Sequence, residues 1–443
     1  MTTAMTTATT AATTTAITRT RHFSATDMGR YELIPFEVPP RTERIDISVA
    51  YTRHATTVAD GITLRREQAV VDLFLHDPND VCVGASGSER TTVFLSGTDA
   101  TPGFKRQPIQ SGGWAIGAGL YKIPEEGLDV TWTITLTPKT MRLFKGDTHV
   151  HTDHSDGGMS VADTIAQAAR QGLAFVFLTD HNTTTQQQPQ PFSPDITVLP
   201  GSEWTHYKGH AGFLGVAQPY KGSFVSNSLA ETQARLKEAQ SLGAMVVLNH
   251  PFCPQCPWLW GFEAVPHDAV EVWNGVMSER NLKALHWWHQ QLLAGRRLPA
   301  VGGSDWHRPG LLGGIGMPCM CLHAWSREPE DLMDAMRAGN GYISYLPQGP
   351  GIQLEDAVFG GEWPADKPLK IAFTDLRGGD VLRLITDQAE EALPCPPDTN
   401  AWELVRTLGS ARFIRFEVLR SYAPGLPPMT AMVSNPIWAG TGI

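Results

Sequence analysis

One stretch of the sequence, residues 143–156, constrains the fold and the chemistry of this chain more than any other. It reads Leu-Phe-Lys-Gly-Asp-Thr-His-Val-His-Thr-Asp-His-Ser-Asp. The apolar start predicts the end of a strand, and in an extended segment side chains two residues apart point to the same side. His149 and His151 can therefore direct two imidazoles at one point. A single His-x-His pair is weak evidence for a metal site. The interpretation therefore depends on the segments that follow.

Four later segments repeat this order, in which an apolar run leads into residues that commonly bind metals. Six imidazoles and three carboxylates form a nitrogen and oxygen ligand set suited to Zn, Mn or Fe. The set exceeds what one ion needs, so it predicts two or three divalent metal ions. A parallel barrel would gather such strand ends on one face. The residues are His149, His151, Asp156, His181, Glu203, His210, His250, Asp305 and His307.

The order and local spacing of these residues resemble the polymerase and histidinol phosphatase (PHP) superfamily. The resemblance covers the middle of the chain, and the flanking pieces are similar to the carbaryl-hydrolase-type branch of PHP proteins. It implies a distorted (β/α)7 barrel with a hydrolytic centre of two or three metal ions. The matching motifs are Asp147–His151 with Ser155–Gly157, Thr179–His181, Gly201–Glu203, His210, Asn249–Pro251 and Ser304–His307.

The resemblance also implies how the ligands divide among the ions. The first ion would take His149, His151, Glu203 and Asp305. The second would take Glu203, His210 and His250, with His206 as a competitor for the position of His210. The third would take Asp156, His181 and His307. Asp156 stands where some relatives have a histidine, and an Asp weakens nitrogen ligation of a third ion. Two ions and three ions therefore both stay open.

Four residues near the motifs are candidates for work on the substrate. Asp305 could orient the nucleophile and relay its proton, and His206 or His154 could protonate the leaving group. For His154, a solvent-exposed loop position is the alternative. Arg308 could contact a substrate anion, and a helix-capping or surface role is equally consistent with its position.

The six cysteines are sparse and irregularly spaced in a long chain, which argues against a disulfide framework. Cys253 and Cys256 form a Cys-x-x-Cys pair just after His250 and Pro251. They are interpreted as two loop thiols at the rim of a pocket. The alternative is a structural zinc site shared with Cys319 and Cys321.

Composition and charge exclude other classes of function. The formal net charge is −10 and the isoelectric point is about 5.8, whereas a nucleic-acid surface usually carries a basic patch. No run of about 18 apolar residues occurs, so no membrane span is expected. The start of the chain lacks the basic and apolar regions of a signal peptide. The cytoplasm is therefore the expected compartment.

The chain is predicted to have four parts. Residues 1–40 are expected as a disordered Thr/Ala-rich tail, and residues 41–142 as a β-sandwich-like domain that serves packing or oligomerisation, or forms a wall of the substrate pocket. Residues 143–347 alternate strands with helices, which favours an α/β barrel. Residues 348–443 return to strands and predict a C-terminal β domain. The helices are expected at residues 160–170, 229–242, 279–293 and 328–338.

These features predict a hydrolase that uses a metal-activated hydroxide on a small-molecule ester. A phosphomonoester or phosphodiester is the expected substrate, and a carboxyl or carbamate ester is the alternative. A non-catalytic, metal-stabilised binding module would predict degraded motifs, whereas all nine positions are filled. A homo-oligomer is left open. Apolar residues near the motifs favour an aromatic or bulky leaving group; they are Phe252, Trp258–Trp260 and Trp306.

Overall fold

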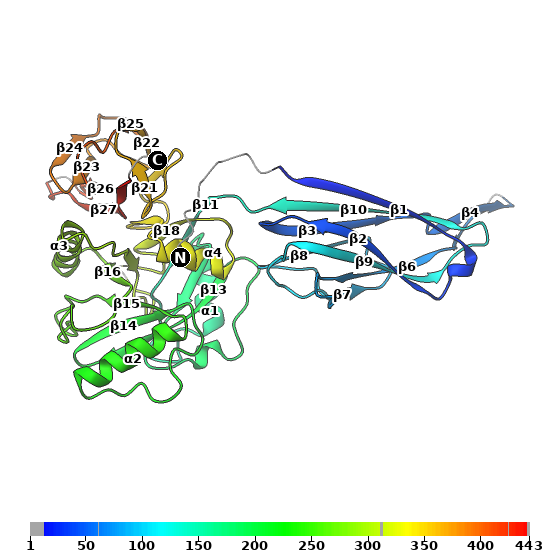
Figure 1. Ribbon diagram of the computed structural model, residues 1–443, viewed down its shortest axis with the longest axis horizontal. Coiled ribbons are helices and arrows are strands. Elements are labelled where there is room, and N and C mark those ends of the chain that lie inside the picture. Colours follow the sequence, from blue (N-terminus) through cyan, green and yellow to red (C-terminus); the bar gives the residue numbers. More distant parts are fainter. Residues whose placement is uncertain (1–12, 61, 311–312, 424, 441–443) are drawn as a thin grey trace. The chain divides into compact units, whose positions relative to one another are not determined.

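The computed structural model describes residues 13–60, 62–310, 313–423 and 425–440 of the chain (Figure 1). Its contacts divide the chain into two compact units, Met1–Thr140 and Met141–Ile443. The boundary between the N-terminal β domain and the helix-containing part, expected after residue 142, therefore lies two residues earlier, after Thr140. In the described residues, no helix is long and apolar enough to cross a membrane.

Two antiparallel four-stranded sheets and one hairpin form the N-terminal unit. One sheet has the order β1 (Thr15–Phe23), β10 (Leu128–Pro138), β3 (Thr42–Ala50) and β8 (Thr92–Ser96). The other has the order β2 (Tyr31–Val38), β9 (Gly112–Lys122), β6 (Val70–His76) and β7 (Cys82–Ser86). The hairpin is β4 (His54–Ala59) with β5 (Ile62–Glu67). Alternate residues of both sheets, such as Trp132 and Trp114, share one apolar core.

The prediction of a disordered tail over residues 1–40 is wrong for its described part. Strand β1 pairs with β10 along its whole length, strand β2 pairs with β9, and the short 3-10 helix η1 (Ala25–Asp27) lies between them. Strand β1 is almost entirely exposed and Thr-rich, so it has little apolar periodicity of its own. Its partner strand supplies the hydrogen bonds that hold it. The first twelve residues lie outside the described part of the chain.

The C-terminal unit begins with a mixed sheet. Parallel pairs join β11 to β12, β12 to β13, β15 to β16 and β16 to β17. Strand β14 is antiparallel to both β13 and β15, and β18 is antiparallel to β11 and β19. The strands are β11 (Arg142–Asp147), β12 (Phe175–Leu178), β13 (Thr197–His206), β14 (Gly209–Leu214), β15 (Met245–Asn249), β16 (Ala269–Asn274), β17 (Ala300–Gly303), β18 (Cys319–Ala324) and β19 (Gly341–Ser344).

The four predicted helices are confirmed within one or two residues at each end. They are α1 (Val161–Arg170), α2 (Leu229–Ser241), α3 (Glu279–Leu293) and α4 (Pro329–Arg337). The Ser160 side chain caps α1 by accepting a hydrogen bond from the Asp163 amide, and Gly172 beyond its end has φ +78°. Helix α1 packs on β12, α2 on β15, α3 on β16 and α4 on β18 (Figure 1).

The unit is therefore a mixed α/β fold that is rich in strands, and the described residues do not show the distorted (β/α)7 barrel that the resemblance implied. Strand β14 is reached from β13 by a tight antiparallel turn, where regular repetition would place a helix. The two ends of the helix-flanked region do meet. His151 N donates to Trp306 O (2.9 Å) and Asp305 N donates to His149 O (2.9 Å), so the segment after β17 lies beside the segment after β11.

Residues 348–443, expected as a separate β domain, fall within the same compact unit. Strand β27 pairs with β19 and continues the long sheet, and the buried Arg420–Asp380 ion pair (2.6 Å) lies among these strands. The strands are β20 (Gly351–Leu354), β21 (Glu362–Pro364), β22 (Leu369–Thr374), β23 (Val381–Thr386), β24 (Glu390–Pro394), β25 (Trp402–Arg406), β26 (Phe413–Arg420), β27 (Met429–Ser434) and β28 (Ile437–Gly440).

Candidate metal centre

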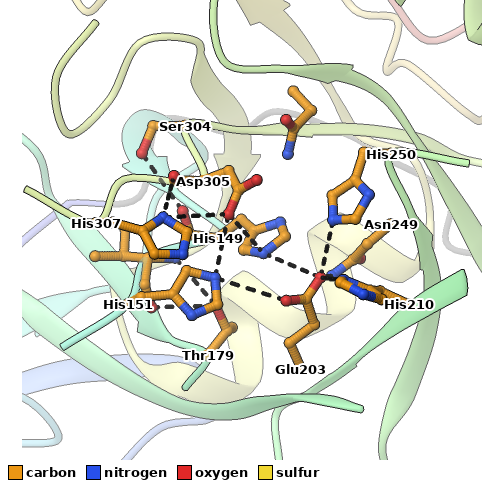
Figure 2. Close-up of polar contacts among 12 residues, drawn as sticks. His149, His151, Thr179, Glu203, His210, Asn249, His250, Ser304, Asp305 and His307 are labelled. Atoms are coloured by element: carbon orange, nitrogen blue, oxygen red, sulfur yellow. Dashed lines mark hydrogen bonds and ion pairs between the residues drawn. The ribbon is translucent and has the colours of Figure 1, made fainter. Parts of the chain in front are cut away.

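The structure brings all nine predicted ligand residues into one connected cluster. Figure 2 shows seven of them, namely His149, His151, Glu203, His210, His250, Asp305 and His307. Strands β11, β12, β15 and β17 deliver their ligands just beyond their last residues, while Glu203 and His210 lie within β13 and β14. Close backbone approach makes this possible, because a Cβ at Gly303 would lie 2.5 Å from the Cβ of His149. The side chains therefore converge from six strands.

Glu203 lies at the middle of the cluster and is fully buried. Its Oε1 is 3.0 Å from His250 Nε2 and 3.3 Å from both His149 Nε2 and His210 Nδ1. Its Oε2 is 2.8 Å from His181 Nδ1. One carboxylate thus faces imidazoles on both of its oxygens, which is the arrangement needed to bridge two cations.

Asp305 lies opposite Glu203, across the first histidine pair. Its Oδ1 is 3.4 Å from His149 Nε2 and 3.2 Å from His151 Nε2. Asp305 has φ +53° and His250 has φ +27°. Residues other than glycine rarely adopt this left-handed backbone conformation. It costs about 1–3 kcal/mol, and such residues are concentrated at functional sites. The fold therefore maintains strain at two predicted ligand positions.

A third group of ligand residues lies nearer the solvent. Asp156 Oδ1 is 3.2 Å from His307 Nε2 and 3.6 Å from His181 Nε2. The ligand atoms of these three residues and of His151 lie within 4.8 Å of one another. The grouping matches the expected third position with one addition, because His151 faces both this group and the first.

The chemistry of the donor atoms fits bound cations. Buried polar atoms without a hydrogen-bond partner gather at this centre, and they include His149 Nε2, both ring nitrogens of His151, Glu203 Oε2 and His210 Nδ1. Leaving such an atom unsatisfied costs about 1–3 kcal/mol. Metal coordination would satisfy these atoms together, so the residues fit two or three divalent ions.

The charges of the cluster shift the pKa values of its members strongly. Burial alone would lower the pKa of His149, but the charges of Asp305, Glu203 and Glu271 outweigh it and raise this pKa well above its usual value. The pKa of His250 is raised in the same way, against burial, by hydrogen bonds with Cys256 and Glu203. In the metal-free protein, the His149 and His250 imidazoles therefore favour the protonated form.

Metal binding is expected to release protons and to weaken as the pH falls. A cation must displace the protons that His149 and His250 hold in the metal-free state, because only neutral imidazole binds a metal. Calorimetric titration with Mn²⁺ or Zn²⁺ in buffers of different ionisation enthalpy would count the protons released. An affinity that does not change with pH would contradict this expectation.

Three further residues, none of them a predicted ligand, hold the ligands in place. Asn249 Nδ2 donates to Glu203 Oε1 (2.9 Å), and Thr205 Oγ1 is 2.6 Å from His181 Nδ1. Glu271, buried in β16, places Oε1 3.0 Å from His149 Nδ1 and accepts from the His250 amide with Oε2 (2.8 Å). The available signal for Glu271 was a charged residue inside the apolar run of residues 269–273.

The Glu271→Gln variant is expected to bind divalent ions roughly 10–100-fold more weakly, as is typical when a partner of a ligand histidine is lost. Glutamine keeps the side-chain volume but removes the charge that orients the His149 ring. Metal titration of the purified variant measures the effect. The exposed Glu355, which pairs with Lys370 (2.9 Å), provides a matched control as Glu355→Gln. Equal affinities in the two variants would exclude the positioning role.

The remaining predicted residues lie around the cluster. His206 stacks on Trp204 (ring centroids 5.5 Å apart) and lies 4.9 Å from the Trp260 ring, and burial lowers its pKa. His154 Nδ1 is 2.8 Å from Thr185 Oγ1, at the edge of a surface cavity of about 950 Å³. The exposed Arg308 donates to the backbone oxygen of Asp156 (3.3 Å). Their roles in proton transfer and substrate binding stay predictions.

The structure separates the two cysteine pairs. Cys256 forms part of a candidate metal group with His210 and His250, whereas the candidate groups among the described residues include neither Cys319 nor Cys321. Cys319 and Cys321 are buried in β18. The alternative of a shared structural zinc site is therefore not supported.

This chain is similar to several solved structures of other proteins. No protein-family model and no curated protein matches it. A two-domain protein from Bacteroides vulgatus, containing a predicted PHP-like metal-dependent phosphoesterase, is 15% identical over 67% of this chain and 96% of its own, with a TM-score of 0.37. A candidate metal-dependent phosphoesterase from Bifidobacterium adolescentis is 20% identical over 38% and 90%, with a TM-score of 0.30.

A third structure is similar over the same share of the chain. It is an amidohydrolase from Chromobacterium violaceum with bound sulfate and no metal, and it is 20% identical over 38% of this chain and 89% of its own, with a TM-score of 0.29. The solved structures similar to this chain thus include two that are described as predicted or candidate metal-dependent phosphoesterases, one of them PHP-like, and an amidohydrolase. At these levels of similarity, a function for this chain has to come from the geometry of its own centre.

Proposed function

We propose that this chain is a metal-dependent hydrolase of phosphoesters, related to the PHP superfamily and to its carbaryl-hydrolase-type branch. The observation that supports this most directly is the position of Glu203, whose two oxygens face the ring nitrogens of ligand histidines from four other strand ends. A purely structural metal site is closed by four ligands, whereas this cluster offers nine.

Bound divalent ions would lower the pKa of water and neutralise charge on substrate oxygens. The protein's part is to hold the donor atoms in fixed positions, which Glu271, Asn249 and Thr205 do through hydrogen bonds to the ligands. The cluster itself is largely buried, so water reaches it mainly from the side of Asp156 and His307. Substrate would enter from that side.

The charge balance of the cluster favours an anionic substrate. Six of the nine ligand residues are imidazoles, which are neutral when they bind metal, so the three carboxylates leave much of the cation charge uncompensated. A phosphoester would complete this balance better than a neutral carbon ester. Asp305, with one oxygen near His149 and His151, is placed to orient the nucleophile and accept its proton.

An aromatic layer joins the segment after His250 to helix α3. The Phe252 ring stacks on Phe262 (5.6 Å between centroids), and Phe262 stacks on Trp287 (4.2 Å). Such a surface suits an aromatic or bulky leaving group. Carboxyl and carbamate esters with leaving groups of this kind are the second candidate substrate class. Protonation of the leaving group falls to His206, His154 or solvent.

Steady-state hydrolysis by manganese-loaded protein tests the proposal. Nitrophenyl phosphate, a bis-aryl phosphodiester, and an aryl acetate or carbamate would be compared, with His149→Ala as the control. Turnover of a phosphoester that is lost in the variant is the expected result, and it sorts monoester from diester activity. Turnover of only the carbon esters would replace the proposal by the second candidate. No turnover with metal bound would favour a non-catalytic binding module.

A further inference from the structure

Two ligand histidines of this centre have the same outer arrangement. In each, the ring nitrogen that faces away from the main ligand contact has an oxygen beside it. His149 Nδ1 has Glu271 Oε1 at 3.0 Å, and His307 Nδ1 has the backbone oxygen of Asp305 at 2.8 Å. Such outer partners fix the tautomer and the orientation of a ligand ring.

His250 departs from this arrangement, because its outer partner is sulfur. Its Nε2 faces Glu203 Oε1 at 3.0 Å, while its Nδ1 lies 3.6 Å from the Sγ of Cys256. The distance is within the range of a hydrogen bond to sulfur. The thiol therefore occupies the place that a carboxylate oxygen holds at the His149 ring and a carbonyl oxygen holds at the His307 ring.

The loop after β15 is folded so that Cys256 returns to the His250 ring. The Cys253 amide donates to His250 O (2.8 Å), and the Trp258 amide donates to Pro251 O (2.9 Å). Cys256 is half-buried, whereas Cys253 is buried, with Sγ near Gln255 Oε1 (3.3 Å) and Arg280 Nη1 (3.9 Å). Of the two thiols, Cys256 is therefore the one that contacts the His250 ring. It is also the more accessible of the two.

We propose that Cys256 is a positioning residue of the metal centre, which orients His250 by accepting a hydrogen bond from its Nδ1. The inference rests on the proposed metal-dependent function and adds a property to it. The ion held by His250 and His210 becomes sensitive to modification of a thiol. In alkylation with iodoacetamide, the ionised sulfur of Cys256 forms a carbon–sulfur bond, iodide leaves, the thiol proton passes to the buffer, and the acceptor of His250 is blocked.

The test compares metal binding by the full chain and by three variants, using Zn²⁺ and Mn²⁺ titrations. Cys256→Ala is expected to weaken one ion roughly 10–100-fold, the usual cost of losing an outer partner of a ligand histidine. Cys256→Asp supplies an oxygen acceptor and is expected to recover most of this loss. Cys253→Ala is the matched control and is expected to bind as the wild type does. Iodoacetamide should weaken metal binding in the wild type and in Cys253→Ala, but not in Cys256→Asp.

Several results would overturn the inference. Wild-type affinity in Cys256→Ala, or equal losses in Cys256→Ala and Cys253→Ala, would remove the role of the sulfur. A sulfur-to-cobalt charge-transfer band in the Co²⁺-loaded wild type that is absent from Cys256→Ala would show a direct ligand in place of a positioning residue. If the wild type binds no divalent ion, the proposed function fails as well. If it binds ions and Cys256→Ala binds them equally well, only this inference fails.

Discussion

Replacing Glu203 with glutamine is expected to lower hydrolysis roughly 10³-fold or more, and to remove at least one metal ion. Losing a single preorganised charge-stabilising group typically costs an enzyme about 10²–10³ in kcat, and Glu203 faces two metal positions at once. Burial alone would raise the pKa of this carboxyl, but the charge of His149 and hydrogen bonds from its imidazole neighbours hold it well below its usual range. The wild-type side chain is therefore an anion that the neutral amide cannot replace.

The experiment needs both kinetics and metal analysis of the Glu203→Gln protein. The exposed Glu279, which pairs with Lys283 (2.8 Å) on α3, provides the control as Glu279→Gln, with activity expected at the wild-type level. Circular dichroism would show that both variants fold. Full activity in Glu203→Gln would exclude a bridging role for this carboxylate and with it the proposed centre.

The Asp305→Asn variant is expected to lose roughly 10²–10³-fold in kcat, with little change in folding. Asparagine tolerates the left-handed backbone that this position requires, so the substitution changes the charge and leaves the local conformation. Burial would raise the pKa of Asp305, whereas the charge of His149 and the close approach of His151 Nε2 (3.2 Å) hold it well below its usual range. The variant thus removes an anion that the site keeps ionised.

A matched control exists at Asp356, which has φ +62° and is exposed. Asp356→Asn repeats the same chemical change in the same backbone conformation away from the cluster, and its kcat is expected to equal that of the wild type. Thermal unfolding of both variants separates stability from catalysis. A kcat that is unchanged in Asp305→Asn would remove this residue from the proposed proton relay.

The sequence by itself determined the features that depend on local pattern. The helices α1 to α4 were predicted because apolar periodicity, N-terminal capping residues and terminal glycines act within a few residues. The grouping of the nine predicted ligands was also predictable, because each lies in or close to a strand-like run in one part of the chain. Metal binding by these residues remains a prediction, which the metal titrations described above would test.

Only the tertiary structure decided which segments become partners. Strand β1 has almost no buried side chains, and it forms because β10 offers a complete row of hydrogen bonds. Strand β14 pairs antiparallel with both β13 and β15, so the expected alternation of parallel strands and helices is interrupted there. Glu271 and Cys256 join the centre through the His149 and His250 rings. The reason is the same in each case, since contacts between distant residues depend on partners that no local window of sequence contains.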